Sequence, residues 1–300
     1  MYPDPKMAGK YLTAVCAGRD FAALLSGRED FYVHSVFPRA INLWDGQRFL
    51  TLLPLGRGGG AVYATLAVEK EVSFSSWGLA PGQKVELLPG DCLRVGPEVI
   101  VDFSSSVPWQ SPLERIKRLP SLNPHNLRAF KLALLGRRTA SPFKGFLQGE
   151  GSKAETLLEQ LEFSVVAPER AELEQALAGI LGWGPGLTPS GDDLILGLSM
   201  ARGVIRKALG LGPGLWEISV RRILNSTHPL SAFFIEEALK GRGHEFVETA
   251  LASLLGMGKV KPETAAERLF DLGATSGFDM ALGLYLALEW QRRYSWCLKG

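Results

Sequence analysis

Two short segments that combine glycine and aspartate have the residue types best suited to chemistry in this sequence. The first is Ser190-Gly191-Asp192-Asp193, and the second, 86 positions later, is Ser276-Gly277-Phe278-Asp279. In both copies another glycine follows the last aspartate by four residues, at Gly197 and at Gly283. Residues four apart share a helix face, so each glycine would let a backbone or a ligand approach the aspartate. The repeated pattern predicts that the two equivalent acids converge on one site.

The residues around the first segment predict the start of a helix. Thr188 is suited to the N-cap, and Pro189 to the first helical position, where no amide proton is needed. Asp192 and Asp193 then fall in the first turn, where the helix dipole favours negative charge. Capping alone explains these residues but not Gly191, because a glycine inside a helix costs roughly 1 kcal/mol relative to alanine. We therefore interpret the loop as a functional site.

The chemistry that such loops could serve is limited. Amides at a helix N-terminus bind anions such as phosphate or carboxylate, but neighbouring carboxylates repel an anion unless a metal intervenes. One interpretation is Mg²⁺ held by Asp192 and Asp193 together with a substrate phosphate. In the other, an aspartate accepts a substrate N–H while the amides hold the carboxylate of the substrate. The spacing excludes a P-loop, because Asp192 stands where the lysine is required, and Leu187 breaks the GxGxxG pattern.

A second polar loop, at 225–231, precedes another predicted helix, which Ser226 or Thr227 could cap. His228 in this loop could be a general acid or base because imidazole titrates near neutrality, although a lone histidine is more often structural. The candidate catalytic residues are therefore Asp193, Asp279, Asp192 and His228. The candidate ligand-binding residues are Gly186, Thr188, Ser190, Gly191, Thr227, Ser231, Thr275, Ser276 and Gly277.

Two parts of the chain with different patterns must position these residues. Residues 1–110 hold short runs of β-branched and aromatic residues between proline and glycine turns, which predicts an antiparallel sheet or small barrel. A proline-rich bridge with short helices is expected over 111–152. From 153 to 300 apolar residues recur at helical spacing, for example in Ala171–Leu181 and Pro262–Leu272. The predicted class is α+β, with a helical bundle carrying both loops.

The composition excludes several classes of protein. The chain has 300 residues, of which 46% are hydrophobic, and a net charge of +2, as expected for a globular protein that binds neither nucleic acid nor membrane. The three cysteines, Cys16, Cys92 and Cys297, form no CxxC pair, and the four histidines form no HExxH motif. The N-terminus does not resemble a signal peptide, and no run of about 18 apolar residues occurs. We expect a cytoplasmic protein.

Several motifs together resemble a known family. The segment Gly186–Asp193 is similar to the hallmark of a large bacterial domain family long described only as being of unknown function, and Gly273–Asp279 is similar to its second motif. Thr227–Ser231 fits a Thr/Ser-rich segment between them. His34–Phe37 and Asn42-Leu43 resemble the β-rich start of that family. The resemblance covers most of the chain, and its first motif is highly specific.

One branch of this family resembles the third subunit of the oxamate carbamoyltransferase of bacterial allantoin (purine) catabolism, which transfers a carbamoyl group between oxalurate and carbamoyl phosphate. The resemblance implies a transferase subunit that binds a small carboxylate or a carbamoyl or acyl phosphate, with other subunits as partners. Mg²⁺ is the one cofactor considered. Two alternatives stay open: a metabolite-binding or regulatory module without chemistry, and a stand-alone Mg²⁺-dependent enzyme acting on a phosphorylated or N-linked substrate. Phe278 stands in the second copy where the first has Asp192, so only one acid per loop, Asp193 or Asp279, is common to both copies.

Overall fold

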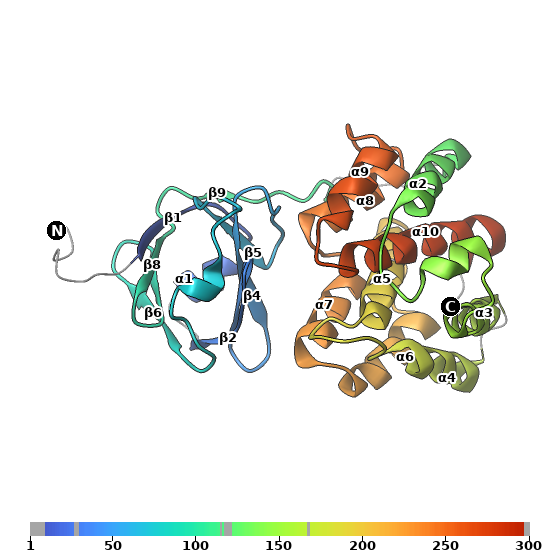
Figure 1. The fold of residues 1–300 in the computed structure, drawn as a ribbon, viewed down its shortest axis with the longest axis horizontal. Helices are drawn as coiled ribbons and strands as arrows, with labels where there is room; N and C mark the ends of the chain where they lie inside the picture. The colour runs from blue at the N-terminus through green and yellow to red at the C-terminus, as the bar shows by residue number, and fades with distance from the viewer. Residues whose placement is uncertain (1–9, 27–29, 115, 117–121, 167–168, 297–300) are drawn as a thin grey trace. The chain divides into compact units, whose positions relative to one another are not determined.

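A computed structural model describes residues 10–26, 30–114, 116, 122–166 and 169–296 (Figure 1). The chain divides into two compact units, Met1–Ser111 and Pro112–Gly300. Strands dominate the first unit and helices the second, which confirms the predicted α+β class. From Pro112 onward, the segment expected as a bridge belongs to the second unit, where its helix α2 (Pro124–Gly136) packs against α9 (Pro262–Phe270) and α10 (Ser276–Tyr294).

The first unit is built around one nine-stranded sheet with the order β5-β4-β3-β2-β6-β7-β8-β1-β9. An additional pairing of β5 with β1 closes eight of these strands on themselves, as the predicted small barrel requires. Most neighbours are antiparallel, whereas β1–β8, β1–β9 and β4–β5 are parallel. The strands are β1 (Lys10–Ala17), β2 (Phe31–Phe37), β3 (Ala40–Trp44), β4 (Phe49–Pro54), β5 (Tyr63–Leu66), β6 (Lys84–Leu88), β7 (Cys92–Val95), β8 (Val99–Asp102) and β9 (Val107–Pro108), with α1 (Phe21–Leu25) and η1 (Phe74–Ser76) between them.

Strands β7 and β8 show how the sheet places apolar residues in the core. In the antiparallel pair β7–β8, Leu93 lies opposite Val101 and Val95 opposite Val99, and all four side chains are fully buried. Successive side chains of a strand point to opposite faces, so this two-residue period directs one face into the core.

The second unit consists of helices that surround a central pair, α5 and α10 (Figure 1). In the part of the chain that is described, no helix is both long and apolar enough to span a membrane. Besides α2, α9 and α10, the elements are η2 (Lys144–Gln148), α3 (Lys153–Val166), α4 (Arg170–Ile180), α5 (Ser190–Ala208), α6 (Leu215–Ile223), η3 (Leu224–Ser226), α7 (Pro229–Leu239) and α8 (Glu245–Leu254).

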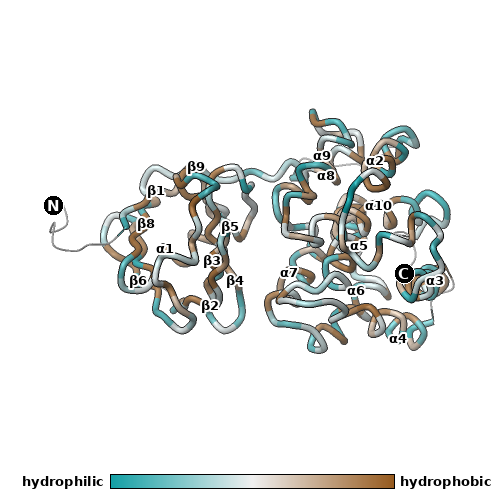
Figure 2. Tube along the Cα trace, viewed as in Figure 1, coloured by the Kyte–Doolittle hydropathy of each residue, from teal (hydrophilic) through white to brown (hydrophobic). Residues whose placement is uncertain are grey.

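The central helices α5 and α10 contain the two copies of the repeat and pack directly on each other. Both are buried along most of their length, and hydrophobic stretches of the chain lie around their labels in Figure 2. A Cβ atom on Gly197 would lie 3.0 Å from the Cα of Gly283, and a Cβ on Gly283 would lie 2.9 Å from the amide nitrogen of Leu198. The glycine after each aspartate is therefore required because the backbone of the other helix passes there, which confirms the predicted close approach.

Candidate functional site

The helix starts of the two repeats lie together. Thr188 Oγ1 lies 3.5 Å from Ser276 Oγ, and Ser190 Oγ lies 3.2 Å from Thr275 Oγ1. Because the backbones meet again about two turns later, at the glycines of the two repeats, α5 and α10 run side by side in the same direction. The positive ends of the two helix dipoles therefore lie next to each other. The four hydroxyl groups named above lie between them.

Each repeat folds its loop back onto the helix that precedes it. Gly191 N–H donates to Trp183 O at 2.9 Å, and Gly277 N–H donates to Leu272 O at 2.8 Å. A Cβ on Gly191 would lie 2.9 Å from the carbonyl carbon of Ile180, and a Cβ on Gly277 would overlap α9 in the same way. The glycine in the first turn, which capping did not explain, is needed for this close packing.

The predicted caps of the two helices are wrong. Helix α5 begins at Ser190 with Pro189 as its N-cap, and Thr188 does not cap it because its hydroxyl faces Ser276 of the other repeat. Helix α7 is capped by His228, whose Nδ1 accepts the Leu230 N–H, rather than by Ser226 or Thr227. In each loop a threonine that was expected to cap the helix instead contacts a distant residue: Thr188 contacts Ser276, and Thr227 bonds to Asp192.

The equivalent acids of the repeats, Asp193 and Asp279, are both buried at these helix starts, with exposed fractions of 1% and 0%. The serine of each repeat bonds to the acid of the other: Ser276 to Asp193, and Ser190 to Asp279. Thr275, from the same repeat as Asp279, bonds to Asp279 as well. The Oδ2 atom of each acid is buried without a hydrogen-bond partner. The two acids thus converge as the repeat predicted, and each keeps one unsatisfied oxygen.

Burial changes the protonation of both acids. Loss of hydration raises the pKa of Asp193 well above its usual range, the Ser276 hydrogen bond lowers it in part, and the negative charges of Asp279 and Asp192 raise it further. Burial likewise raises the pKa of Asp279 to about 7, against hydrogen bonds that favour the carboxylate. Burial therefore favours the protonated form of both acids, and Asp279 titrates near neutrality.

Asp192 has a different environment from the two equivalent acids. Its Oδ1 accepts the Gly182 N–H at 2.7 Å, and its Oδ2 accepts the hydroxyl of Thr227. Asp192 is fully buried, as is its counterpart Phe278. These bonds tie the loop before α5 to the loop before α7.

The residues considered for Mg²⁺ do not form a ligand set. Both oxygens of Asp192 already accept hydrogen bonds, so a shared ion with Asp193 would have to displace one of them. Among the described residues, no cluster of three or more His, Cys, Asp or Glu side chains is arranged to hold a metal ion. We derive no step that depends on a metal.

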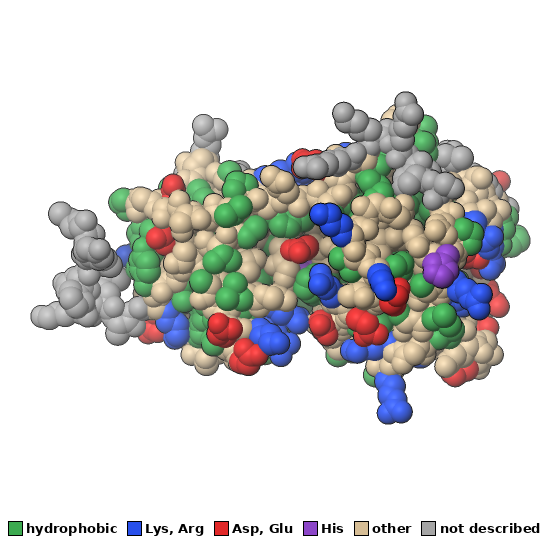
Figure 3. All heavy atoms as spheres, turned by 90° about the horizontal axis from the view of Figure 1, so that it is seen from above, with side chains coloured by type: hydrophobic (Ala, Val, Ile, Leu, Met, Phe, Trp, Pro, Cys, Tyr) green, Lys and Arg blue, Asp and Glu red, His purple; other side chains and the backbone are tan. Residues whose placement is uncertain are grey.

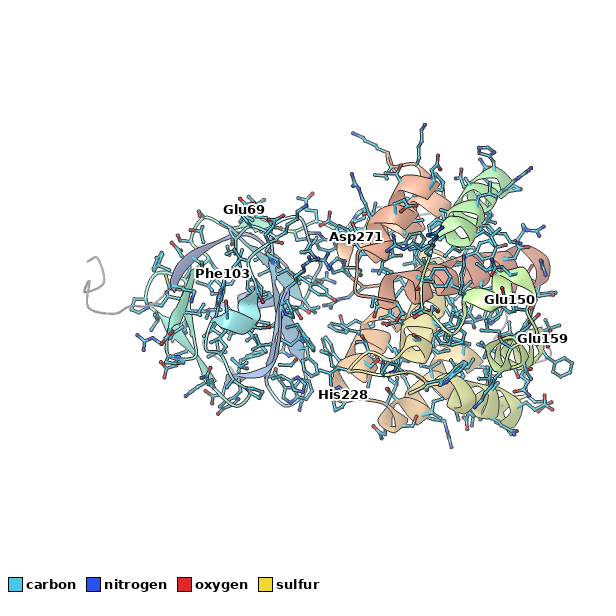
Figure 4. The ribbon with its side chains drawn as sticks, viewed as in Figure 1. Glu69, Phe103, Glu150, Glu159, His228 and Asp271 are labelled. Atoms are coloured by element: carbon cyan, nitrogen blue, oxygen red, sulfur yellow. The ribbon has the colours of Figure 1, made fainter. Side chains whose placement is uncertain are left out.

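The remaining candidates lie around this centre at different depths. His228 is half-buried at the start of α7, where its ring nitrogen is engaged in the cap (Figure 4). Ser231 is buried in the first turn of the same helix. Gly186 is exposed in the loop before α5 and has a φ of 90°. Thr227 contacts the site because its hydroxyl bonds to Asp192, whereas His228 accepts a backbone N–H of its own helix.

Ser141 is a site residue that sequence reasoning missed. Its hydroxyl bonds to Asp279, which is 138 positions away in sequence, and also accepts the Phe143 N–H at 3.1 Å. Lys144, three residues after Ser141, donates to Leu134 O and Leu135 O. Its Nζ lies 5.6 Å from the ring centroid of Phe278. The only signal for Ser141 was a polar Ser-Pro turn, which is too common to indicate a site.

Comparison with known families follows the division of the structure. Residues 180–288, which contain both repeats, match the family described as oxamate carbamoyltransferase subunit AllH. Residues 10–108, which form the β-rich unit, match the AllH family N-terminal domain. Together the matches cover about two thirds of the chain. This chain belongs to the AllH family. The resemblance noted from the two glycine-aspartate motifs is confirmed, and no solved structure matches the chain.

Proposed function

We propose that this protein is a subunit of a carbamoyl-transferring enzyme of the oxamate carbamoyltransferase type, active in the cytoplasm in allantoin catabolism. Its role is to bind a small carboxylate or a carbamoyl or acyl phosphate where α5 and α10 begin. AllH family membership supports the reaction class and the presence of partner subunits. The paired helix starts support the place of binding.

The observation that carries this proposal is the pairing of two helix N-termini around a group of hydroxyls. A helix N-terminus attracts an anion through its dipole and its amides, and here two such ends lie side by side. Thr188, Thr275 and Ser276 are half-buried, so their hydroxyls are at the depth where a surface ligand can reach them. On the face of this unit drawn in Figure 3, acidic and basic side chains are interspersed, and neither sign of charge dominates.

The chemistry of the substrates fits these groups. Oxamate and oxalurate combine a carboxylate with an amide, and carbamoyl phosphate is an anion, so all three need hydrogen-bond donors. Hydroxyls and loop amides held in place before the reaction can stabilise the negative charge that develops on a carbonyl oxygen during carbamoyl transfer. Asp279, which titrates near neutrality, can exchange a proton with an attacking or departing amide through Ser190 or Thr275.

A second candidate function is a metabolite-binding subunit that performs no chemistry. The observation that favours it is the complete burial of Asp193 and Asp279, which lie beneath the hydroxyls. In that case the hydroxyl surface recognises the ligand, while partner subunits supply the reacting groups.

A thermal-shift titration with oxamate, oxalurate and carbamoyl phosphate tests the site. A ligand present at 100 times its Kd should stabilise the folded protein by roughly 2.7 kcal/mol. We expect Ser276→Ala to weaken this shift at least several-fold, while Ser105→Ala, at an exposed serine of the β-rich unit, leaves it unchanged. The absence of any ligand shift in the wild type, or an equal loss in both variants, would refute binding at this site.

Reconstitution separates the candidate functions. A carbamoyltransferase subunit should co-purify with partner chains and support turnover only in their presence. A binding module should bind the same ligands, and its Ser276→Ala variant should leave the turnover rate of the saturated complex unchanged. Metal-dependent turnover by the isolated chain would instead support the stand-alone enzyme.

A further inference from the structure

A chain of hydroxyl groups connects the surface with the buried carboxyl of Asp279. Thr275 is half-buried at the start of α10, and its Oγ1 lies 3.2 Å from Ser190 Oγ. Both hydroxyls bond to Asp279, and Ser141 bonds to the same carboxyl from the segment before η2. Three hydroxyl groups from three different segments therefore serve one acid.

The other repeat contains the equivalent chain, from Thr188 through Ser276 to Asp193. In each repeat one carboxylate oxygen is unsatisfied although the acid is buried. Within the described residues, no lysine or arginine forms an ion pair or a hydrogen bond with Asp193 or Asp279. The protein thus surrounds two buried acids with hydroxyls and provides no positive charge to balance them.

Protons are the simplest way to neutralise this pair. Two neighbouring buried carboxylates without a cation are strongly unfavourable, so at least one binds a proton. Mg²⁺ would keep several water molecules in an octahedral shell, which a pair with exposed fractions of 0% and 1% does not provide. Of the charged groups around the pair, Asp192 is hydrogen-bonded on both oxygens, and Lys144, three residues after Ser141, donates to carbonyls at the end of α2.

We propose that Asp279 is a proton switch that regulates anion binding at the shared start of α5 and α10. When Asp279 is protonated, the surface hydroxyl of Thr275 donates outward to an anion; when Asp279 is ionised, that hydroxyl donates inward. The inference rests on the function proposed above and adds how pH controls the same site.

The direction of the hydrogen bonds gives the reason. An ionised carboxylate only accepts hydrogen bonds, so Ser141, Ser190 and Thr275 turn their hydrogens toward it. Their lone pairs then face away from Asp279, and Thr275 presents its lone pairs to the surface, where they repel an anion. A protonated Asp279 brings its own hydrogen and needs fewer donors, so Thr275 is released to donate outward. Anion binding then takes up one proton from solvent onto Asp279, and anion release returns it.

The pKa values identify which of the two acids switches. Burial raises the pKa of Asp279 to about 7, and it raises the pKa of Asp193 well above its usual range. The proton that is gained or lost near pH 7 is therefore assigned to Asp279, to which the hydroxyls of Ser141, Ser190 and Thr275 bond.

Isothermal titration calorimetry with oxamate tests the switch, because the carboxylate of oxamate stays ionised between pH 6 and pH 8. The full-length protein is titrated at both pH values in buffers with different enthalpies of ionisation, which report proton uptake directly. For one coupled group with a pKa of about 7, the Kd should rise about tenfold from pH 6 to pH 8. At pH 8 binding should take up close to one proton.

Two aspartate-to-asparagine variants assign the effect. Asp279→Asn should bind oxamate with the same Kd at both pH values and without proton uptake, because the amide does not titrate. Asp271→Asn makes the same chemical change at an exposed residue directly after α9 (Figure 4) and should keep the tenfold dependence. Asp193→Asn should keep it as well, because the switch is assigned to Asp279.

The outcomes separate the switch from the proposed function. Oxamate binding that is independent of pH and takes up no proton in the wild type overturns the switch and leaves the anion site standing, a result that needs no variant to fold. Binding that requires added Mg²⁺, or a pH dependence lost in Asp193→Asn rather than Asp279→Asn, also overturns the switch. The absence of binding at either pH refutes the anion site together with the switch.

Discussion

Replacing Asp279 with asparagine should make the helical unit more stable at alkaline pH. Burial raises the pKa of Asp279 from its ordinary value of 3.8 to about 7 in the folded state. The folded protein therefore binds more protons than the unfolded chain between about pH 4 and pH 7, and its free energy of unfolding falls as the pH rises through this window. Asparagine has the same shape and carries no charge, so the free energy of unfolding of the variant does not fall in this way as the pH rises.

The size of the effect follows from the pKa difference. A rise from 3.8 to about 7 corresponds to about 4 kcal/mol at 1.36 kcal/mol per pKa unit, and the wild type bears this cost fully only above pH 7. The asparagine side chain of the variant would lose part of the hydrogen bonding from Ser141, Ser190 and Thr275, at about 1 kcal/mol for a lost bond. We expect Asp279→Asn to raise the free energy of unfolding by about 3 kcal/mol at pH 8 and to change it by less than about 1 kcal/mol at pH 4.5, where the wild type bears only about 1 kcal/mol of this cost.

Urea unfolding followed by circular dichroism at 222 nm measures this difference, because the helices that dominate this signal lie in the second unit. Asp271→Asn, at an exposed residue, should change stability by less than about 0.5 kcal/mol at either pH. The reasoning would be refuted by an effect of Asp279→Asn that has the same sign and size at pH 4.5 and pH 8, because the carboxyl would then not titrate between these values.

Two further substitutions test the packing of the repeats. Gly197→Ala should lower the free energy of unfolding by about 1–3 kcal/mol or more, because its methyl group would overlap the α10 backbone, whereas Gly212→Ala, which has nothing within 4 Å, should leave it nearly unchanged in the same urea assay. Thr227→Val should cost about 1–3 kcal/mol because it leaves buried Asp192 without one hydrogen bond, and exposed Thr264→Val is its control. Equal effects in a variant and its control would contradict the packing described.

Local sequence patterns predicted most of the secondary structure correctly. The helix predicted at Ala171–Leu181 is observed at Arg170–Ile180, and the one predicted at Pro262–Leu272 is observed at Pro262–Phe270. These elements were predictable because an apolar residue every three or four positions gives a helix a face to bury. The patterns were less informative about the sheet, which contains parallel pairs as well as the expected antiparallel ones.

The details of the site depended on contacts between distant residues. Thr188 was expected as a cap, but its hydroxyl lies against Ser276, 88 positions away. Ser141 could not be found from sequence because its partner Asp279 is 138 positions away. Asp192 and Asp193 are adjacent and chemically identical, yet only Asp193 has an unsatisfied oxygen.

The sequence alone determined that two Ser-Gly-x-Asp-x-x-x-Gly elements exist, that each begins a helix, and that the chain resembles the AllH family, because these properties lie in residue types and short spacings. Only the tertiary structure decided that the two helices pack in parallel and that the serine of each repeat bonds to the aspartate of the other. It also decided that the pKa of Asp279 rises to about 7. The physical reason is that the charge state of a buried acid depends on its hydration and its neighbours, and here folding brings those neighbours together from positions far apart in the chain.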